Sequence, residues 1–229
     1  MKYIVKGQAP KELSEYRKNS SACFKNCPLE VKEAMRQQLI KEQHGLCAYC
    51  MARINDEWNE KLQKFRTEIE HYIPQSAHSI NDLDYSNLLG VCNGNAGYPK
   101  HKQHCDKSKA DQTITVNPFR PDCETHTIFN RSGEITSTIK EIEADLAKTL
   151  NLNEQTLVKN RQVVIQHLYE SLSRICQRGK TKLKAIKKLI DYWQAIENKM
   201  LKEYCQTAIF FLNKEFEDVQ RSSRCGVRN

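Results

Sequence analysis

Apolar residues recur along the chain with two different periods. In the first part, Val31, Met35 and Leu39 recur at helical spacing, after Pro28 and before Gly45. Proline suits a first helical turn and glycine commonly ends a helix. The pattern therefore predicts a helix that begins at about residue 28.

The stretch EIEHYIPQS reads as the end of a strand. Ile69, His71 and Ile73 alternate with polar or aromatic neighbours, and Pro74 cannot donate a further ladder hydrogen bond. Neighbouring residues of a strand face opposite sides, so Glu70 and His71 can serve one site only if the backbone bends there. Pro74 is the residue that we expect to bend it.

Polar segments surround this strand. Residues 51–66 predict a knuckle followed by an irregular or short helical insert. Residues 76–109 are rich in Asn, Gly, His and Lys, which is typical of loops, and only the apolar piece NLLGVC interrupts them. Within 112–136, TITVNPF and THTIFN predict two β-like segments, and RSGE predicts the turn after the second.

From Ser137 the period changes to that of helices. Thr138 and Glu141 have the spacing of a capping box, in which each side chain binds the backbone of the other, so they predict the start of a helix. We see no internal repeat and no low-complexity tract. We therefore expect two regions, 1–136 and 137–229, of which the second is helical.

Two further helices are predicted in this second region. Asn153 is a predicted N-cap for one of them, which ends near Gly179. The other begins around Thr181, and its apolar stripe continues to Met200. These stripes indicate faces that pack either in the core or against a partner.

The composition is that of a folded protein with a basic surface. The chain has 229 residues, 39% hydrophobic and 28% charged, which argues against wholesale disorder. Lys plus Arg outnumber Asp plus Glu by 36 to 28, and this net charge of +8 suits a polyanionic partner, although many basic proteins bind no nucleic acid. The N-terminal sequence lacks the apolar core of a signal peptide, and AIFFL is too short to span a bilayer. We expect a soluble, cytoplasmic protein.

The cysteines indicate a metal site. In a reducing compartment, the ten cysteines favour metal ligands and buried small residues over disulfides. Cys47 and Cys50 have the C-x-x-C spacing by which two thiolates grip one Zn²⁺. Cys92 and Cys105 are the candidates for the other two ligands, provided that the segment between them closes on itself.

Other interpretations of these cysteines stay open. The C-x-x-C pair could be two buried cysteines without a common role. It could also be a redox dithiol, although no βαβ pattern surrounds it. Cys23 and Cys27 compete as the second pair of ligands.

Taken in order along the chain, these pieces resemble a nuclease motif. A C-x-x-C pair, Glu-His before a proline, Asn-Leu-Leu, a third cysteine and His-Cys-Asp follow one another as in zinc-stapled HNH, or ββα-metal, nucleases. CAYC, IEHYIPQS, YSNLLGVCNGN, HCDKSK and VNPF are similar to the PtuB nucleases of Septu-type antiphage systems, some of which are retron-associated. The resemblance implies an α+β fold, with a zinc-stapled ββα-metal core over 47–109 and a helical C-terminal region.

The resemblance also implies a reaction and partners. The family hydrolyses nucleic-acid phosphodiester bonds with a metal ion, and the substrate could be DNA or transfer RNA. An ATPase partner called PtuA is implied, and in retron systems a reverse transcriptase with its RNA–DNA product. The rival hypothesis is a zinc-stapled nucleic-acid-binding or adaptor module without catalysis.

The resemblance assigns roles to four residues. His71 aligns with the general base, Glu70 and Asp106 with the ligands of the catalytic metal, and Asn87 with the residue that orients the base. Asp106 departs from the family, where His or Asn is usual at this position. The long insert before Cys105 also makes two histidines rivals for the catalytic metal, namely His104 and His101.

These residue types suit the chemistry. A neutral imidazole, with a pKa near 6.5, can take a proton from water, provided that the Asn87 carboxamide or a backbone carbonyl holds its other nitrogen. Carboxylate oxygens favour Mg²⁺ or Mn²⁺ over Zn²⁺. Taken singly, however, His71 could be a core histidine, Asn87 a turn residue and Asp106 a surface charge.

Basic residues form two groups that could contact phosphates, although lysines in loops are commonly just solvated. The first group surrounds the motif and comprises Lys100, Lys102, Lys107 and Lys109. The second opens the last predicted helix and comprises Arg178, Lys180, Lys182 and Lys184, followed by Lys187 and Lys188.

Overall fold

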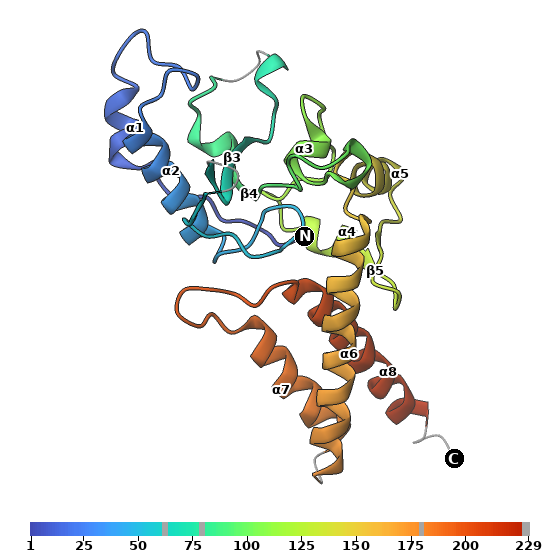
Figure 1. The fold of residues 1–229 in the computed structure, drawn as a ribbon. Helices are drawn as coiled ribbons and strands as arrows, with labels where there is room; N and C mark the ends of the chain where they lie inside the picture. The colour runs from blue at the N-terminus through green and yellow to red at the C-terminus, as the bar shows by residue number, and fades with distance from the viewer. Residues whose placement is uncertain (61–63, 78–80, 179–180, 226–229) are drawn as a thin grey trace.

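A computed structural model describes residues 1–60, 64–77, 81–178 and 181–225. The fold is α+β, as expected, with short antiparallel strand pairs and longer helices. In Figure 1 the strand pair at the centre of the upper half lies beside the N-terminal helices, and the long C-terminal helices lie in the lower half. No described helix is long and apolar enough to cross a membrane.

The N-terminal third supplies two helices and a short hairpin. Helix α1 spans Lys11–Tyr16, and α2 spans Leu29–Glu42 directly after Pro28, which confirms the predicted start. In the polar insert that we predicted to be irregular or helical, β1 (Trp58–Asn59) pairs with β2 (Lys64–Phe65). The helical alternative is therefore wrong for the described part of the insert.

The central hairpin carries the Glu-His pair. Strand β3 (Thr67–His71) runs antiparallel to β4 (Leu88–Cys92), with the 3-10 turns η1 (Gln75–Ala77) and η2 (Tyr85–Asn87) between them. Helix α2 packs against both strands. Just after α2, the Gln43 carboxamide both donates to and accepts from the Gly90 backbone at 2.7 Å, which fixes the hairpin to the helix end.

The two predicted β-like segments have different outcomes. The second contains β5 (Ile128–Phe129), which pairs with β6 (Ile135–Thr136) across the predicted RSGE turn. The first, at 113–119, is described throughout but forms no strand. There the Asp145 carboxylate accepts the backbone N–H groups of residues 115 and 116, so these donors are satisfied by a side chain instead of a neighbouring strand.

The predicted capping box is also wrong. Helix α4 (Cys123–His126) precedes β5, and α5 (Lys140–Ala144) continues into the π-helical turn η4 (Asp145–Thr149). The Ser137 backbone N–H donates to Glu143 at 2.8 Å, two residues beyond the acid of the predicted box. The shift follows from the later start of the helix, at Lys140.

Two of the long helices lie where they were predicted, but not every predicted end is correct. Helix α6 (Gln155–Gln177) is capped by Glu154 and not by the predicted Asn153. The carboxamide oxygen and nitrogen of Asn153 instead bind the Ile135 backbone. Helix α7 (Lys182–Gln194) begins where predicted, with Thr181 as its cap, but ends before Met200. Helix α8 (Cys205–Cys225) was not predicted. One hydrophobic cluster includes residues on both sides of residue 136, and the domain boundary there stays a prediction.

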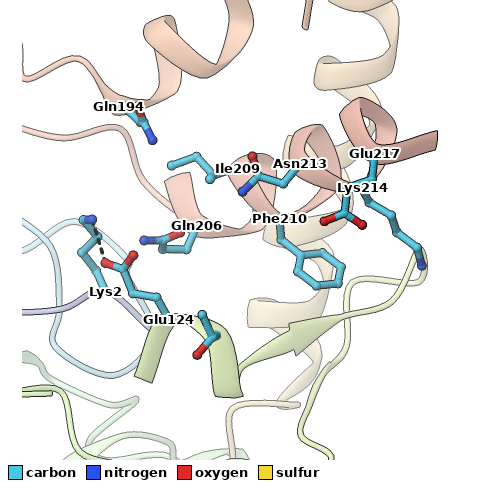
Figure 2. Close-up of a pocket in the computed structure, with 10 residues that line it drawn as sticks. Lys2, Glu124, Gln194, Gln206, Ile209, Phe210, Asn213, Lys214 and Glu217 are labelled. Atoms are coloured by element: carbon cyan, nitrogen blue, oxygen red, sulfur yellow. Dashed lines mark hydrogen bonds and ion pairs between the residues drawn. The ribbon is translucent and has the colours of Figure 1, made fainter. Parts of the chain in front are cut away.

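A cavity of about 490 Å³ lies between the N-terminal segment, α4 and α8. Figure 2 shows the Lys2–Glu124 ion pair on one side and Ile209 and Phe210 of α8 on the other. It lies apart from the hairpin that carries Glu70. Its lining includes no residue of the resembled motif.

A buried arginine joins the β5–β6 turn to α6. Arg161 is 1% exposed, and its guanidinium donates to the carbonyls of Gly133 and Leu152 at 2.5 and 2.7 Å. Gly133 has a φ of +83°, and a Cβ there would lie 2.5 Å from a backbone oxygen of α6. The turn can therefore approach the helix only with glycine at this position.

We predict that Arg161→Lys lowers the free energy of unfolding by about 2–4 kcal/mol, because a lysine cannot reproduce the fork of two donors to buried carbonyls. Denaturant unfolding of the purified protein measures the change. The exposed Lys159→Arg on the same helix is the control and should stay within about 0.5 kcal/mol of wild type. An equally small effect of Arg161→Lys would contradict the prediction.

Candidate metal centre and carboxylate–histidine site

The thiol groups of Cys47, Cys50, Cys92 and Cys105 form one cluster, with all four sulfurs within 4.8 Å of one another. Three sulfur pairs are 3.7, 3.8 and 3.9 Å apart. Sulfurs that bind a tetrahedral Zn²⁺ at about 2.3 Å are about 3.8 Å apart, so the spacing fits. Burial by itself raises the pKa of Cys47, but hydrogen bonds from the other thiols lower it. The four cysteines could hold a structural metal such as zinc.

Tight backbone presents the first pair of cysteines. Cys47 and Cys50 lie in a turn after α2, where Met51 N donates to the Cys47 carbonyl at 3.1 Å and Met51 itself has a φ of +65°. Another N–H of this turn donates to the Gly90 carbonyl at 3.1 Å. The knuckle is thereby joined to β4, whose last residue is Cys92.

The insert between Cys92 and Cys105 closes on itself, as the zinc hypothesis requires. His104 N donates to the Gly94 carbonyl at 3.0 Å. Gly94 has a φ of +55°, and a Cβ there would lie 2.2 Å from the His104 carbonyl oxygen. The closure therefore requires glycine at position 94.

Asp106 begins α3 (Asp106–Lys109) and is hydrogen-bonded to the carboxyl group of Glu70. The Tyr49 hydroxyl donates to Glu70 Oε1 at 3.3 Å, and Lys109 Nζ lies 2.7 Å from the same oxygen. Glu70 is 6% exposed and Lys109 is fully buried, whereas Asp106 is half-buried. The carboxyl pair therefore reaches the surface on the side of Asp106.

The carboxyl pair has unusual protonation. Burial and the adjacent Asp106 raise the pKa of Glu70 to about 8, although Lys109 acts in the opposite direction. Burial would raise the pKa of Asp106, but hydrogen bonds from Glu70 and Lys107 lower it. Two carboxyl groups this close hold a proton between them at neutral pH, and a bound cation would replace it.

His71 is 7% exposed at the end of β3. Its ring packs edge-to-face on Phe24, with centroids 4.7 Å apart, and Nε2 lies 2.7 Å from the Asp82 carbonyl oxygen. Since a carbonyl only accepts, Nε2 carries the proton and the lone pair of the neutral ring is on Nδ1. Burial lowers the pKa of His71, although the Asp82 carbonyl acts in the opposite direction, so the ring is neutral at pH 7.

Asn87 holds the bend that follows His71. Its Nδ2 donates to the Ile73 carbonyl at 2.9 Å, and its Oδ1 accepts from Ile73 N at 2.8 Å. Its own carbonyl accepts from Tyr72 N at 2.9 Å. Of the two holders considered for the histidine ring, the backbone carbonyl of Asp82 has that position, while the Asn87 carboxamide fixes the backbone after the strand.

The two rival histidines lie away from the carboxyl pair. His104 is buried, with Nδ1 3.2 Å from the Cys105 sulfur and 4.0 Å from that of Cys92. His101 is exposed, and its carbonyl accepts from Asn151. These positions favour Asp106 over either histidine as the partner of Glu70.

Two of the predicted phosphate-binding lysines are already paired. Lys107 forms ion pairs with Glu68 and Asp106, the latter at 2.9 Å. Burial lowers the pKa of Lys107, but the two carboxylates outweigh burial and raise it. Lys109 pairs with Glu70 and also donates to the His71 carbonyl at 3.1 Å. Both lysines therefore help to build the site.

The remaining predicted basic residues are mostly at the surface. Lys182 forms an ion pair with Glu215 of α8 at 2.6 Å, and Lys180 lies outside the described residues. The exposed ones are Lys100 and Lys102 in the 3-10 turn η3 (Lys100–Lys102), Arg178, and Lys184.

Three further contributors were missed by the sequence analysis. Tyr49 lies inside the C-x-x-C knuckle, and this placement between two metal-type cysteines is a signal that could have been used. Asp82 contributes its backbone carbonyl, and Phe24 comes from a remote N-terminal segment. Neither of these contacts has a signal in residue type or spacing.

No family model and no curated protein matches the chain. The assignment of function therefore rests on the geometry above and on the resemblance of the motif.

We predict that Cys92→Ser and Cys105→Ser each lose bound zinc and lower the melting temperature, because a serine hydroxyl does not replace a thiolate ligand. Elemental analysis and thermal unfolding of the purified variants measure both effects. Cys176→Ser, a half-buried cysteine outside the cluster, is the control and should keep its zinc. Full zinc and full stability in both cluster variants would remove Cys92 and Cys105 from the ligand list.

Proposed function

We propose that the chain is an HNH-type endonuclease that hydrolyses nucleic-acid phosphodiester bonds with a divalent metal ion. One observation carries the proposal. The hydrogen-bonded carboxyl groups of Glu70 and Asp106 lie at the strand end that also carries His71. The ring proton of this histidine is on Nε2, which donates to the Asp82 carbonyl, so the lone pair of Nδ1 is free. A metal-type oxygen pair beside a neutral imidazole is the donor set for metal-assisted hydrolysis. The four-cysteine cluster beside it suits the zinc-stapled form.

The residues present fit a catalytic Mg²⁺ or Mn²⁺. Glu70 and Asp106 supply the hard oxygen donors that these ions prefer, and the side of Asp106 is open to solvent. These two carboxylates would hold the ion, which supplies a positive charge that polarises a scissile phosphate.

The protein's own groups account for the proton transfer. The Nδ1 atom of His71 accepts a proton from the attacking water, and the Asp82 carbonyl stabilises the imidazolium through the Nε2 proton. The depressed pKa of His71 keeps the ring ready as a base at neutral pH. Asn87 holds the turn after the strand, so the ring keeps its place.

The adaptor hypothesis has one observation in its favour. Lys109 already neutralises Glu70, and Phe24 already packs on His71, so the buried polar groups have partners without any substrate or ion. In that case the chain would bind zinc, but its stability would not respond to Mg²⁺ or Mn²⁺. An effector role in antiphage defence, the ATPase partner and the reverse transcriptase rest on the resemblance alone.

We predict that His71→Ala lowers the cleavage rate by about 10²–10⁴-fold while zinc content is kept, because a general base supplies a factor of this size. Plasmid, single-stranded DNA and total transfer RNA, each with Mg²⁺ or Mn²⁺, serve as substrates. Glu70→Ala and Asp106→Ala should also fail, but excess Mn²⁺ should partly rescue them, since they weaken metal binding. The same excess should not rescue His71→Ala.

Asn87→Ala should be milder than any of these, because it loosens the turn and leaves the base in place. Exposed Lys159→Ala, outside both predicted groups of phosphate-binding residues, is the control and should keep most activity. Cleavage by His71→Ala at the wild-type rate would refute the mechanism. Full activity of Asp106→Ala would return the ligand role to His104.

We predict two acid limbs in the pH profile of cleavage, depending on the metal concentration. His71 must be neutral, and its lowered pKa keeps it so above pH about 6.5, so at saturating Mn²⁺ activity should fall only below that pH. Glu70 must lose its proton to bind metal, so at limiting Mn²⁺ activity should keep rising up to pH about 8. Steady-state rates at both concentrations test this, and an acid limb unaffected by metal would contradict it.

A further inference from the structure

A groove of about 250 Å³ lies between α6 and α7 in the lower half of the molecule. Its polar lining is basic: Arg174 and Arg178 come from the end of α6, and Lys188 comes from α7. His167 and Tyr192 also line it, and no carboxylate is among its lining residues. All five side chains are exposed. Within the described part of the chain, neither arginine nor Lys188 has an ion-pair partner.

Three lysines of the basic run that lie on α7 are directed to two different sides of this helix. Lys182 pairs with Glu215, and the Lys187 ammonium lies 5.9 Å from the centre of the Phe216 ring, so both are directed to α8. These two lysines join helices. Lys188 instead lies in the groove on the side of α6, with Arg174 and Arg178 across from it.

The groove has an aromatic wall at one end. Tyr192 is 45% exposed, and Lys202 Nζ lies 4.1 Å from the centre of its ring. The ring of Trp193 meets it edge-to-face at 5.7 Å. The Tyr192 ring is thus supported by its neighbours and still presents apolar surface to a ligand.

We propose that this groove binds the phosphate backbone of a single-stranded nucleic acid, with Tyr192 stacking on a base. Unpaired cations that track a groove and an aromatic ring beside them are the two features of such sites. From His167 to Arg178, at the end of the helix, the rise is about 16 Å, enough for roughly five phosphates at the 3.4 Å spacing of a stacked strand. The substrate class rests on the proposed function, but the groove is a second contact surface, away from the hairpin.

An acidic protein segment is the alternative occupant for such charges. The aromatic ring separates the two cases, because a base gains by stacking on Tyr192 and a carboxylate chain does not. A ligand recognised by its charge alone would need only the cations and no exposed ring.

The test measures binding of a fluorescent oligodeoxythymidine by anisotropy, in a His71→Ala background without added Mg²⁺ or Mn²⁺, so that the probe stays intact. We expect Arg174→Ala with Lys188→Ala to reduce the slope of log K against log salt by about 1.4, or 0.7 for each lost phosphate contact. Tyr192→Ala should weaken binding at least about fivefold with an unchanged slope, and Tyr192→Phe should restore it.

The control is Lys159→Ala with Lys214→Ala, which removes the same charge from exposed positions of α6 and α8 outside the groove. It should leave the slope unchanged. An equal loss of slope in the control, or no effect of Tyr192→Ala, would overturn the proposal. Polyglutamate binding as tight as that of the oligonucleotide, and unchanged by Tyr192→Ala, would also overturn the proposal. If the protein with its native His71 binds the oligonucleotide tightly in the groove but cleaves no nucleic acid, the nuclease proposal is refuted and the groove proposal is not.

Discussion

A single step of backbone, from Cys105 to Asp106, ties the cysteine cluster to the carboxyl pair. Cys105 has a φ of +55°, and its N–H donates to the Leu150 carbonyl at 2.8 Å, while its thiol lies within the cluster. The next residue begins α3 and meets Glu70. A metal that fixes the four thiols therefore also fixes Asp106 and the short helix that carries Lys109. Zinc would act on the chemistry only by holding this geometry.

The alternation of a strand explains how two neighbouring residues can do different things. Glu70 extends toward α3, where it meets Asp106 and Lys109, whereas the His71 ring lies against Asp82 and Phe24. The partners of Glu70 also act on His71, because the charges of Lys109 and Asp106 both affect the pKa of the imidazole, which burial lowers. The bend after the strand is held by a side chain from η2 and not by proline alone.

Sequence signals were sufficient where the deciding contacts are local. The helix starts after Pro28 and around Thr181 depend on residues within one turn, and both starts were predicted correctly. Side chains that bind distant backbone could not be read this way, since Asn87 and Asn153 each satisfy a partner more than a dozen residues away. Helix α8 was hidden by a stripe extended through Met200, although the preceding helix α7 ends at Gln194, where Ala195 is already extended with a ψ of 130°.

Lys109 is fully buried, which is rare for a lysine in an ordinary protein core. Taking an ammonium and a carboxylate out of water costs several kcal/mol for each ion, and their attraction repays this only with further hydrogen bonds. The Lys109 ammonium pairs with Glu70 and also donates a hydrogen bond to the His71 carbonyl. Even so, Glu70 keeps a pKa of about 8, so Lys109 and a shared proton together carry the positive charge that the carboxyl pair requires. The proposed nuclease chemistry would require this carboxyl pair to exchange its proton for a divalent ion.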